Sequence, residues 1–227
     1  MFYLKPTSRG MGVEIWGTYQ TLRNLYDTFN KFLYNDPPFD KKGFENREKL
    51  LSSFTYMIRK TYEGQRLKKK IDNLNIHEEN ITLFGHKISW VHFLFTMSAL
   101  KYNMRFFETS KLDLSILFQI EYWLKDAMYE YDKKGAEQLE GFIEDGLCGA
   151  NEYIYHYMRF ANAEYIIMGG GKKAFRELPK ILRIGIFQTK EYEEYKSSLE
   201  NDAKHHNCPV NELELNDDHV PYDSMKW

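Results

Sequence analysis

Alternating apolar positions near the start of the chain predict a β-hairpin. Val13 and Ile15 share one face of residues 13–16, and this period of two is typical of a strand. A second apolar run at 2–5 comes before it, and a turn at 8–12 that contains two glycines separates the two runs. We therefore expect a hairpin in which the first run pairs with the second.

Apolar residues at steps of three and four predict helices over most of the remaining chain. Thr18 and Ser89 each precede such a pattern and carry the side-chain oxygen that caps a helix N-terminus. Pro37 and Pro38 would end the first helix, and Pro179 would kink or restart a late one. The expected helices cover approximately residues 18–34, 45–62 with a continuation through 66–70, 90–107, 113–131, 136–145, 151–168, 172 onward, and 190–206.

Residues 81–88 predict a second hairpin. The apolar segments 81–84 and 87–88 flank residues 85–86, and a two-residue loop with glycine in first place suits a type II′ turn. Because an isolated two-stranded hairpin is unstable, we expect strand 13–16 to pair with strand 81–84.

These elements predict an α+β fold, a predominantly α-helical single domain with a small antiparallel sheet built from two hairpins. A purely helical domain with isolated ribbons is the alternative. The chain has 227 residues, 43% of them hydrophobic, which is enough for one substantial core. We expect residues 1–206 to form the globular domain with its N-terminal hairpin and residues 207–227 to form an acidic, frayed tail.

The charge of the chain excludes one class of function and divides the sequence into regions. A formal net charge of −2 argues against a dedicated nucleic-acid-binding protein, because that class is usually strongly basic. Residues 1–75 hold 14 basic and 8 acidic side chains, whereas residues 186–227 hold 4 and 10. The acidic end could fold over a basic surface, or it could act as a solubilising tail.

Targeting signals and cysteines indicate the compartment. The first residues lack the basic and apolar regions of a secretory signal, and the most apolar run, 90–100, is too short to cross a bilayer. The two cysteines, Cys148 and Cys208, form neither a CxxC motif nor a disulfide framework. We therefore expect a cytoplasmic protein without a membrane span.

Four stretches of the sequence resemble a known family. They are residues 12–19 (GVEIWGTY), 89–95 (SWVHFLF), 102–109 (YNMRFFET) and 168–175 (MGGGKKAF). Together they resemble a family of uncharacterised bacterial proteins classified as a domain of unknown function. The resemblance implies one domain over most of the chain and carries with it no activity, cofactor or catalytic residue.

The best local candidate for binding chemistry is a triglycine turn followed by two lysines, Gly169, Gly170, Gly171, Lys172 and Lys173. Three glycines allow backbone N–H groups to converge on an anion, and the next helix would direct its positive end there. The GxxxxGK[ST] spacing of a P-loop is missing, and a simple break between helices is the alternative. We expect at least one of the glycines to have positive φ, and the turn and Lys172 to lie at the surface. Phosphate should raise the melting temperature, and less so after Lys172→Ala/Lys173→Ala.

The helix after the triglycine turn carries a basic stripe, Lys173, Arg176, Lys180 and Arg183, at steps of three, four and three. Such a stripe suits an acidic partner, a membrane surface or phosphates. It is equally compatible with the solvated face of an ordinary surface helix. A second basic cluster has the same ambiguity and consists of Arg66, Lys68, Lys69 and Lys70.

Histidines offer the few candidates for catalysis. His92 lies in the uncharged helix and would serve as a general base or, as buried histidines more commonly do, as a hydrogen-bonded core residue. An enzyme built on the triglycine turn would combine His92 or His156 with Arg105 or Arg159.

Metal binding has weaker support. Glu152 with His156, and Asp202 with His206, stand four residues apart on a helix face, which is also the spacing of routine helix-stabilising pairs. The HExxH and paired ExxH motifs are missing, so we expect neither a metal nor a cofactor.

The sequence therefore favours a non-enzymatic intracellular binding or regulatory module that recognises an acidic protein or a phosphate-bearing ligand through the triglycine turn and the basic stripe. The alternative is an enzyme that holds a small anionic substrate in the triglycine turn. Aromatic residues left over from the core would allow a homodimer.

Overall fold

The computed structural model describes residues 2–33, 42–71 and 81–227. Along the chain, the described residues form four strands and eight α-helices. The strands are β1 (Tyr3–Pro6), β2 (Gly12–Gly17), β3 (Leu67–Ile71) and β4 (Ile81–Ser89). The helices are α1 (Tyr19–Lys31), α2 (Phe44–Tyr62), α3 (Trp90–Met104), α4 (Lys111–Tyr131), α5 (Lys133–Glu144), α6 (Ile154–Ile167), α7 (Gly171–Leu182) and α8 (Lys190–His206).

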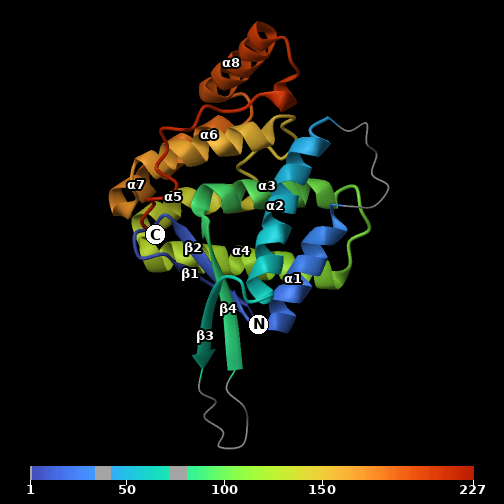
Figure 1. Cartoon of the computed structure of the whole chain (residues 1–227), viewed down its shortest axis with the longest axis vertical. Coiled ribbons are helices and arrows are strands. Elements are labelled where there is room, and N and C mark those ends of the chain that lie inside the picture. Colours follow the sequence, from blue (N-terminus) through green and yellow to red (C-terminus); the bar gives the residue numbers. More distant parts are fainter. Residues whose placement is uncertain (1, 34–41, 72–80) are drawn as a thin grey trace, which may run out of the picture.

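The four described strands form one antiparallel sheet in the order β1-β2-β4-β3. Helix α4 packs along β1, helix α1 packs on β2, and helix α2 packs on β4. Figure 1 shows β3 and the outer part of β4 extending away from the helical body. The expected fold class, a mostly helical α+β domain with a small antiparallel sheet, is confirmed.

Helix α3 forms the centre of the core, as its lack of charge predicts. Trp90, Phe93 and Leu94 are fully or almost fully buried, and α3 contacts α2, α5, α6 and the sheet. The Trp90 indole donates a 2.9 Å hydrogen bond from Nε1 to the carbonyl of Gly10. This bond satisfies the one polar atom of a large buried ring and ties α3 to the N-terminal hairpin.

Both expected helix caps are confirmed. The Thr18 hydroxyl accepts a hydrogen bond from the Thr21 amide at 3.3 Å, and the Ser89 hydroxyl accepts one from the His92 amide at 3.1 Å. The β1–β2 hairpin is confirmed as well, with Tyr3 opposite Trp16. Helix α1 ends at Lys31, earlier than expected, and residues 35–38, which were expected to stop it, lie outside the described residues.

The expected turn at residues 85–86 is wrong, because β4 runs straight through it. Gly85 lies opposite Trp16, and a Cβ on this glycine would come within 2.6 Å of the indole. The glycine therefore permits the close approach of a ring rather than a reversal of the chain. Strand β2 does pair with β4, but Val13 faces Ile88, so the register lies further along β4 than expected.

The expected continuation of α2 through residues 66–70 is also wrong. Gly64 has φ +76°, and the Gln65 amide donates to the Lys60 carbonyl at 3.0 Å, which closes the helix in a left-handed turn. The lysines that follow form β3, where the Lys69 ammonium lies 4.2 Å from the centre of the Trp16 ring. The second hairpin therefore consists of β3 and β4.

The segment after α8 runs back across the body to the N-terminal hairpin. The Leu213 carbonyl lies 3.3 Å from His156 Nε2, and Asp217 forms a 2.6 Å ion pair with Arg159. At the end of the chain, the Ser8 hydroxyl donates to the Trp227 carbonyl at 2.7 Å. Among the described residues, no helix has both the length and the apolar character needed to span a membrane.

Candidate functional site

The triglycine turn has the backbone conformation that its sequence predicts. Gly169, Gly170 and Gly171 have φ values of +74°, +72° and +88°, so the expectation of at least one positive φ is confirmed. Gly169 and Lys172 are exposed, as expected, and α7 begins at Gly171.

The turn is held against the N-terminal hairpin. The Gly171 amide donates a 2.6 Å hydrogen bond to the Arg9 carbonyl. A Cβ on Gly170 would come within 2.5 Å of the same carbonyl and 2.8 Å of Met11 Sδ. The turn therefore joins two segments that lie 160 positions apart, and one of its amides already has an acceptor within the chain.

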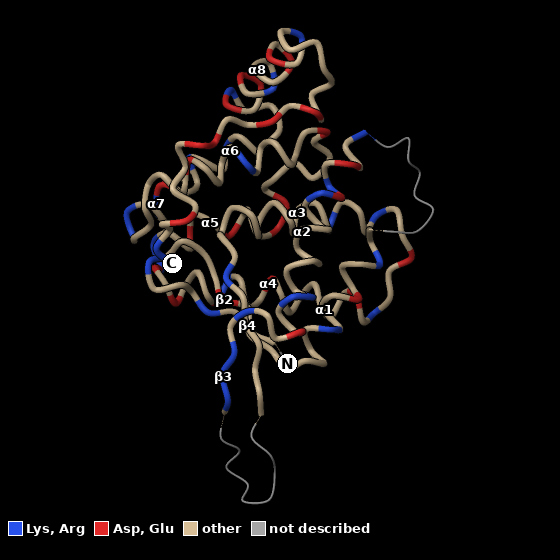
Figure 2. Tube along the Cα trace, in the orientation of Figure 1, with Lys and Arg blue, Asp and Glu red and all other residues tan. Residues whose placement is uncertain are grey.

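The basic stripe on α7 is largely neutralised by carboxylates. Arg176 donates two hydrogen bonds, of 2.8 and 2.7 Å, to the two oxygens of Asp132. These bonds from Arg176 lower the pKa of Asp132 to about 2. Lys180 pairs with Glu177, and Arg183, directly after α7, pairs with Glu191, so carboxylates lie among the basic residues of this region (Figure 2). Helix α7 runs through Pro179 without the expected restart.

Lys172 and Lys173 differ from the rest of this group. Both side chains are exposed, and neither forms an ion pair within residues 2–33, 42–71 and 81–227. Anion binding at the triglycine turn therefore stays a prediction, one that depends on these two lysines.

His156, one of the two candidate catalytic histidines, lies far from the triglycine turn. His156 and Gly169 lie near opposite ends of α6, and the helical rise places them roughly 20 Å apart. The two ring nitrogens of His156 face the Asn46 side chain and the Leu213 carbonyl. His92 Nε2 is buried, and no described group forms a hydrogen bond with it. Burial lowers the pKa of His92 to about 4.

The candidate metal pairs are not assembled into a site. The Glu152 carboxylate lies 3.9 Å from the Lys42 ammonium. His156, four positions later, has its Nδ1 beside the Asn46 side chain. Asp202 and His206 are both exposed on α8. In the part of the chain that the structure describes, no group of three or more His, Cys, Asp or Glu side chains is placed to hold a metal ion.

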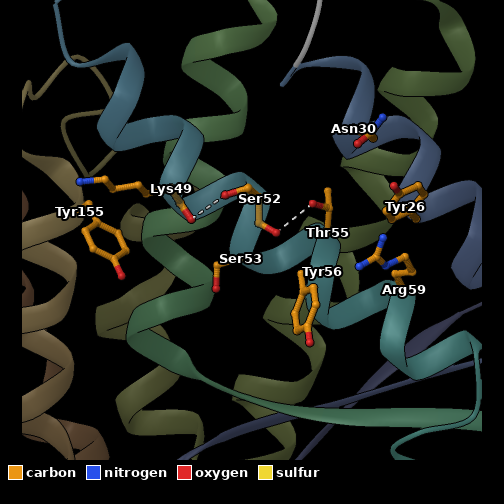
Figure 3. A pocket seen from close by; sticks show the side chains of 9 residues that line it. All are labelled: Tyr26, Asn30, Lys49, Ser52, Ser53, Thr55, Tyr56, Arg59 and Tyr155. Atoms are coloured by element: carbon orange, nitrogen blue, oxygen red, sulfur yellow. Dashed lines mark hydrogen bonds between the residues drawn. The ribbon is translucent and has the colours of Figure 1, made fainter.

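The structure shows instead a hollow of about 500 Å³ over the outer face of α2 (Figure 3). Helix α1 bounds it on one side and α6 on the other. Its described lining contains two cations, six hydroxyl groups and one amide, and no carboxylate. The lining residues are Tyr26, Asn30, Lys49, Ser52, Ser53, Thr55, Tyr56, Arg59 and Tyr155.

Arg59 is the most distinctive side chain of this hollow. Its Nε is buried, yet no described group accepts a hydrogen bond from it. The nearest described carboxylate oxygen, Oε1 of Glu63, lies 4.0 Å from Nε, at the outer limit of an ion pair. The guanidinium stacks 5.4 Å from the Tyr56 ring centre and points toward Tyr26 and Thr55 in Figure 3. Nε is therefore a donor without a described acceptor, and 44% of the Arg59 side chain is exposed.

The second cation lies at the other end of the hollow. Lys49 Nζ lies 5.7 Å from the centre of the Tyr155 ring and donates a 3.3 Å hydrogen bond to the Asn211 carbonyl. Between the two cations, the Ser52 and Thr55 hydroxyls donate to α2 carbonyls and keep their oxygen lone pairs available (Figure 3). The arrangement suits a ligand rich in oxygen atoms and carrying negative charge.

The sequence carries only a weak signal for this site. Lys49, Ser52, Ser53 and Tyr56 recur at steps of three and four, which is also the pattern of any polar helix face. Tyr155 comes from a helix about a hundred positions later, and only the packing of α2 beside α6 brings it there.

Comparisons with known proteins identify a family without an assigned activity. Neither the curated proteins nor the solved structures contain a match to this chain. The model of the family described as domain of unknown function DUF6904 matches residues 2–227, so the chain belongs to that family.

Proposed function

We propose that this protein is a cytoplasmic, non-enzymatic binding or regulatory module whose ligand is a small phosphate-bearing molecule held in the hollow over α2. One observation carries the proposal. Arg59 directs a guanidinium with a buried, unsatisfied Nε into a hollow that has hydroxyls and no carboxylate in its described lining. The Arg59 side chain is 44% exposed, so its outer N–H groups can reach a phosphate oxygen that enters the hollow.

The chemistry of the lining supports a phosphate group in particular. A guanidinium offers parallel N–H donors that match two phosphate oxygens, and Tyr26 and Thr55 place hydroxyls beside it. The remaining hydroxyls and Lys49 are suited to the polar remainder of the ligand. A volume of about 500 Å³ is in the range of small-molecule sites.

Two further features agree with a binding module in a reducing compartment. Cys148 and Cys208 are both free. His156, one of the two histidines available to an enzyme at the triglycine turn, lies at the far end of α6. This separation counts against an enzyme that uses His156 there.

Isothermal titration calorimetry with pyrophosphate and with phosphoserine, at matched ionic strength, tests the proposal. We expect the native protein to bind at least one of them, and Arg59→Ala to weaken binding about tenfold or more, as loss of a charge-assisted hydrogen bond implies. Arg59→Lys should recover only part of the affinity, because lysine keeps the positive charge but lacks the parallel N–H donors of a guanidinium.

Arg23→Ala is the matched control. Arg23 is an exposed arginine on α1 that contacts Tyr19 and Asp27 and does not line the hollow. It should bind like the native protein. Absence of binding to the native protein, or equal binding by Arg59→Ala, would contradict the proposal.

A further inference from the structure

The two outer edges of the sheet differ in what covers them. Strand β1 forms one edge, and helix α4 packs along it. Strand β3 forms the other edge, extends away from the helical body (Figure 1), and among the described elements packs extensively only against β4. Every second residue of an edge strand directs its backbone N–H and C=O groups away from the sheet. The edge of β3 therefore offers backbone donors and acceptors to an added strand.

The ribbon formed by β3 and β4 has two faces of opposite character. Leu67 and Ile71 lie on one face together with Ile81, which stands opposite Ile71 on β4, and all three are exposed. Lys68 and Lys70 alternate with them along β3, so their side chains lie on the other face, where both are exposed. One face of the ribbon is therefore apolar and the other is basic.

Lys69 shares the apolar face, but its ammonium is turned back toward the body of the protein. Its Nζ lies 4.2 Å from the centre of the Trp16 ring and 5.3 Å from that of Tyr3. The charge is thus already engaged with two aromatic rings. The surface around Leu67 and Ile71 consequently stays apolar.

The lysines of the basic face have no carboxylate partner. Neither Lys68 nor Lys70 forms an ion pair in the part of the chain that the structure describes, and β3 and β4 contain no carboxylate. The Lys68 ammonium lies 5.9 Å from the centre of the Phe84 ring, a contact that leaves its N–H donors available. The basic face is therefore complementary to an acidic partner.

We propose that the open edge of β3 binds an extended segment of another protein in which acidic and apolar residues alternate. The segment adds a strand to the sheet beside β3. Its acidic side chains then lie beside Lys68 and Lys70 on one face, and its apolar side chains lie beside Leu67 and Ile71 on the other. Backbone hydrogen bonds supply affinity, and the alternating side chains supply selectivity.

The two faces select such a strand over other partners. A membrane surface or a nucleic acid would contact one face of the ribbon and leave the backbone groups of the edge unpaired. A second copy of β3 would bring lysines against lysines, because the strand has three lysines and no carboxylate. A strand added at the edge contributes side chains to both faces at once, so it alone matches both.

Fluorescence anisotropy of the full chain with a labelled peptide of alternating glutamate and valine provides the first test. We expect the native protein to bind this peptide, and to bind about tenfold more weakly a peptide of the same composition whose glutamates are grouped at one end. Lys68→Glu/Lys70→Glu should also weaken binding about tenfold, because two pairs of opposite charge become pairs of like charge. Lys133→Glu/Lys134→Glu is the matched control, since both lysines are exposed on α5 and the change in net charge is the same.

Blocking the backbone of the peptide provides a second test. N-methylation of two adjacent central residues removes an N–H on each edge of the peptide and keeps every charge, so it should abolish binding. Circular dichroism should show that both protein variants stay folded. Failure of the native protein to bind the alternating peptide would overturn the proposal, as would equal binding of the grouped or the methylated peptide. A single-stranded oligonucleotide of equal charge that competes as well as the alternating peptide would show a general polyanion surface and would also overturn it.

Discussion

The triglycine turn and the hollow over α2 both place cations beside a helix, but they differ in what those cations touch. Arg176 on α7 is held by both oxygens of Asp132, and Arg183, directly after α7, is held by Glu191. In the hollow, Arg59 has a buried nitrogen with no described acceptor. The difference teaches that unsatisfied donors, rather than a high local number of basic residues, distinguish a candidate anion site from a neutralised surface.

The largest effect should come from removing the carboxylate that holds the α7 stripe. Asp132 bonds Arg176 twice and also accepts from the Gly135 amide at the start of α5. Asp132→Ala should lower the free energy of unfolding by about 3 kcal/mol, as the sum of a charge-assisted pair and a helix cap implies. Urea denaturation measures this change.

Glu191→Ala provides the contrast, because its pair with Arg183 is exposed and should matter little. If Asp132→Ala were as stable as the native protein, Arg176 would not be held as the structure shows, and the comparison of the two regions would fail.

Gly170→Ala should have the next largest effect. Gly170 combines a φ of +72° with a close approach to the Arg9 carbonyl, so alanine should cost about 2–3 kcal/mol. A Cβ at Gly169 would have no atom within 4 Å. Gly169→Ala should therefore lower the free energy of unfolding only by the cost of positive φ, about 1 kcal/mol. Thermal unfolding of the two variants separates the contact from the backbone strain, and equal losses would show that the contact with the hairpin is unimportant.

Much of the fold could be predicted from local patterns. Thr18 and Ser89 cap their helices because capping depends on residues three positions away. Gly85 and the lysines of β3 misled the prediction. A two-residue loop with glycine first usually means a tight turn, and a lysine-rich stretch after a helix suggested a continuation of that helix. Here the Trp16 ring occupies the space above Gly85 and stacks on Lys69, and that ring is about seventy positions away in the sequence.

The candidate site shows the same limit more strongly. The positive φ of the triglycine turn follows from the glycines themselves. The acceptor of Gly171 and the carboxylate partners of α7 come from distant segments, so the sequence could not show that this region is largely neutralised. Arg59 gave no signal because Tyr26 beside it and Tyr155 at the other end of the hollow belong to other helices.

His92 sharpens the comparison, because its Nε2, like Nε of Arg59, is buried without a described hydrogen-bond partner, yet His92 lines no described anion site. Burial lowers its pKa, and that of nearby His86, to about 4 in the folded state. The unfolded chain therefore takes up protons first, near pH 6.5, and stability falls as the pH decreases from there toward 4. From pH 7 to pH 5, each ring should account for a loss of roughly 2 kcal/mol.

Urea denaturation of the native protein and of His92→Gln at both pH values measures this effect. The variant should lose less stability between pH 7 and pH 5 than the native protein does. An equal loss in both proteins would mean that His92 titrates normally and is not sealed in the core.

The smallest effect should come from removing the two lysines beside the triglycine turn, where the sequence predicts anion binding. Pyrophosphate should raise the melting temperature of the native protein by binding the folded state. Because Lys172 and Lys173 are exposed, Lys172→Ala/Lys173→Ala should reduce that rise only slightly, whereas Arg59→Ala should remove most of it. Differential scanning fluorimetry measures these rises. If the double lysine variant loses more of the rise than Arg59→Ala does, the anion site lies at the triglycine turn.

The most direct test of the central claim follows the Arg59 Nε–H resonance by nuclear magnetic resonance during a titration with pyrophosphate. The Arg59 side chain lines the hollow, and its Nε has no described acceptor. We predict a saturable shift of that resonance at concentrations that leave the Lys172 and Lys173 amides unchanged. A resonance that stays constant while those two amides shift would contradict the account.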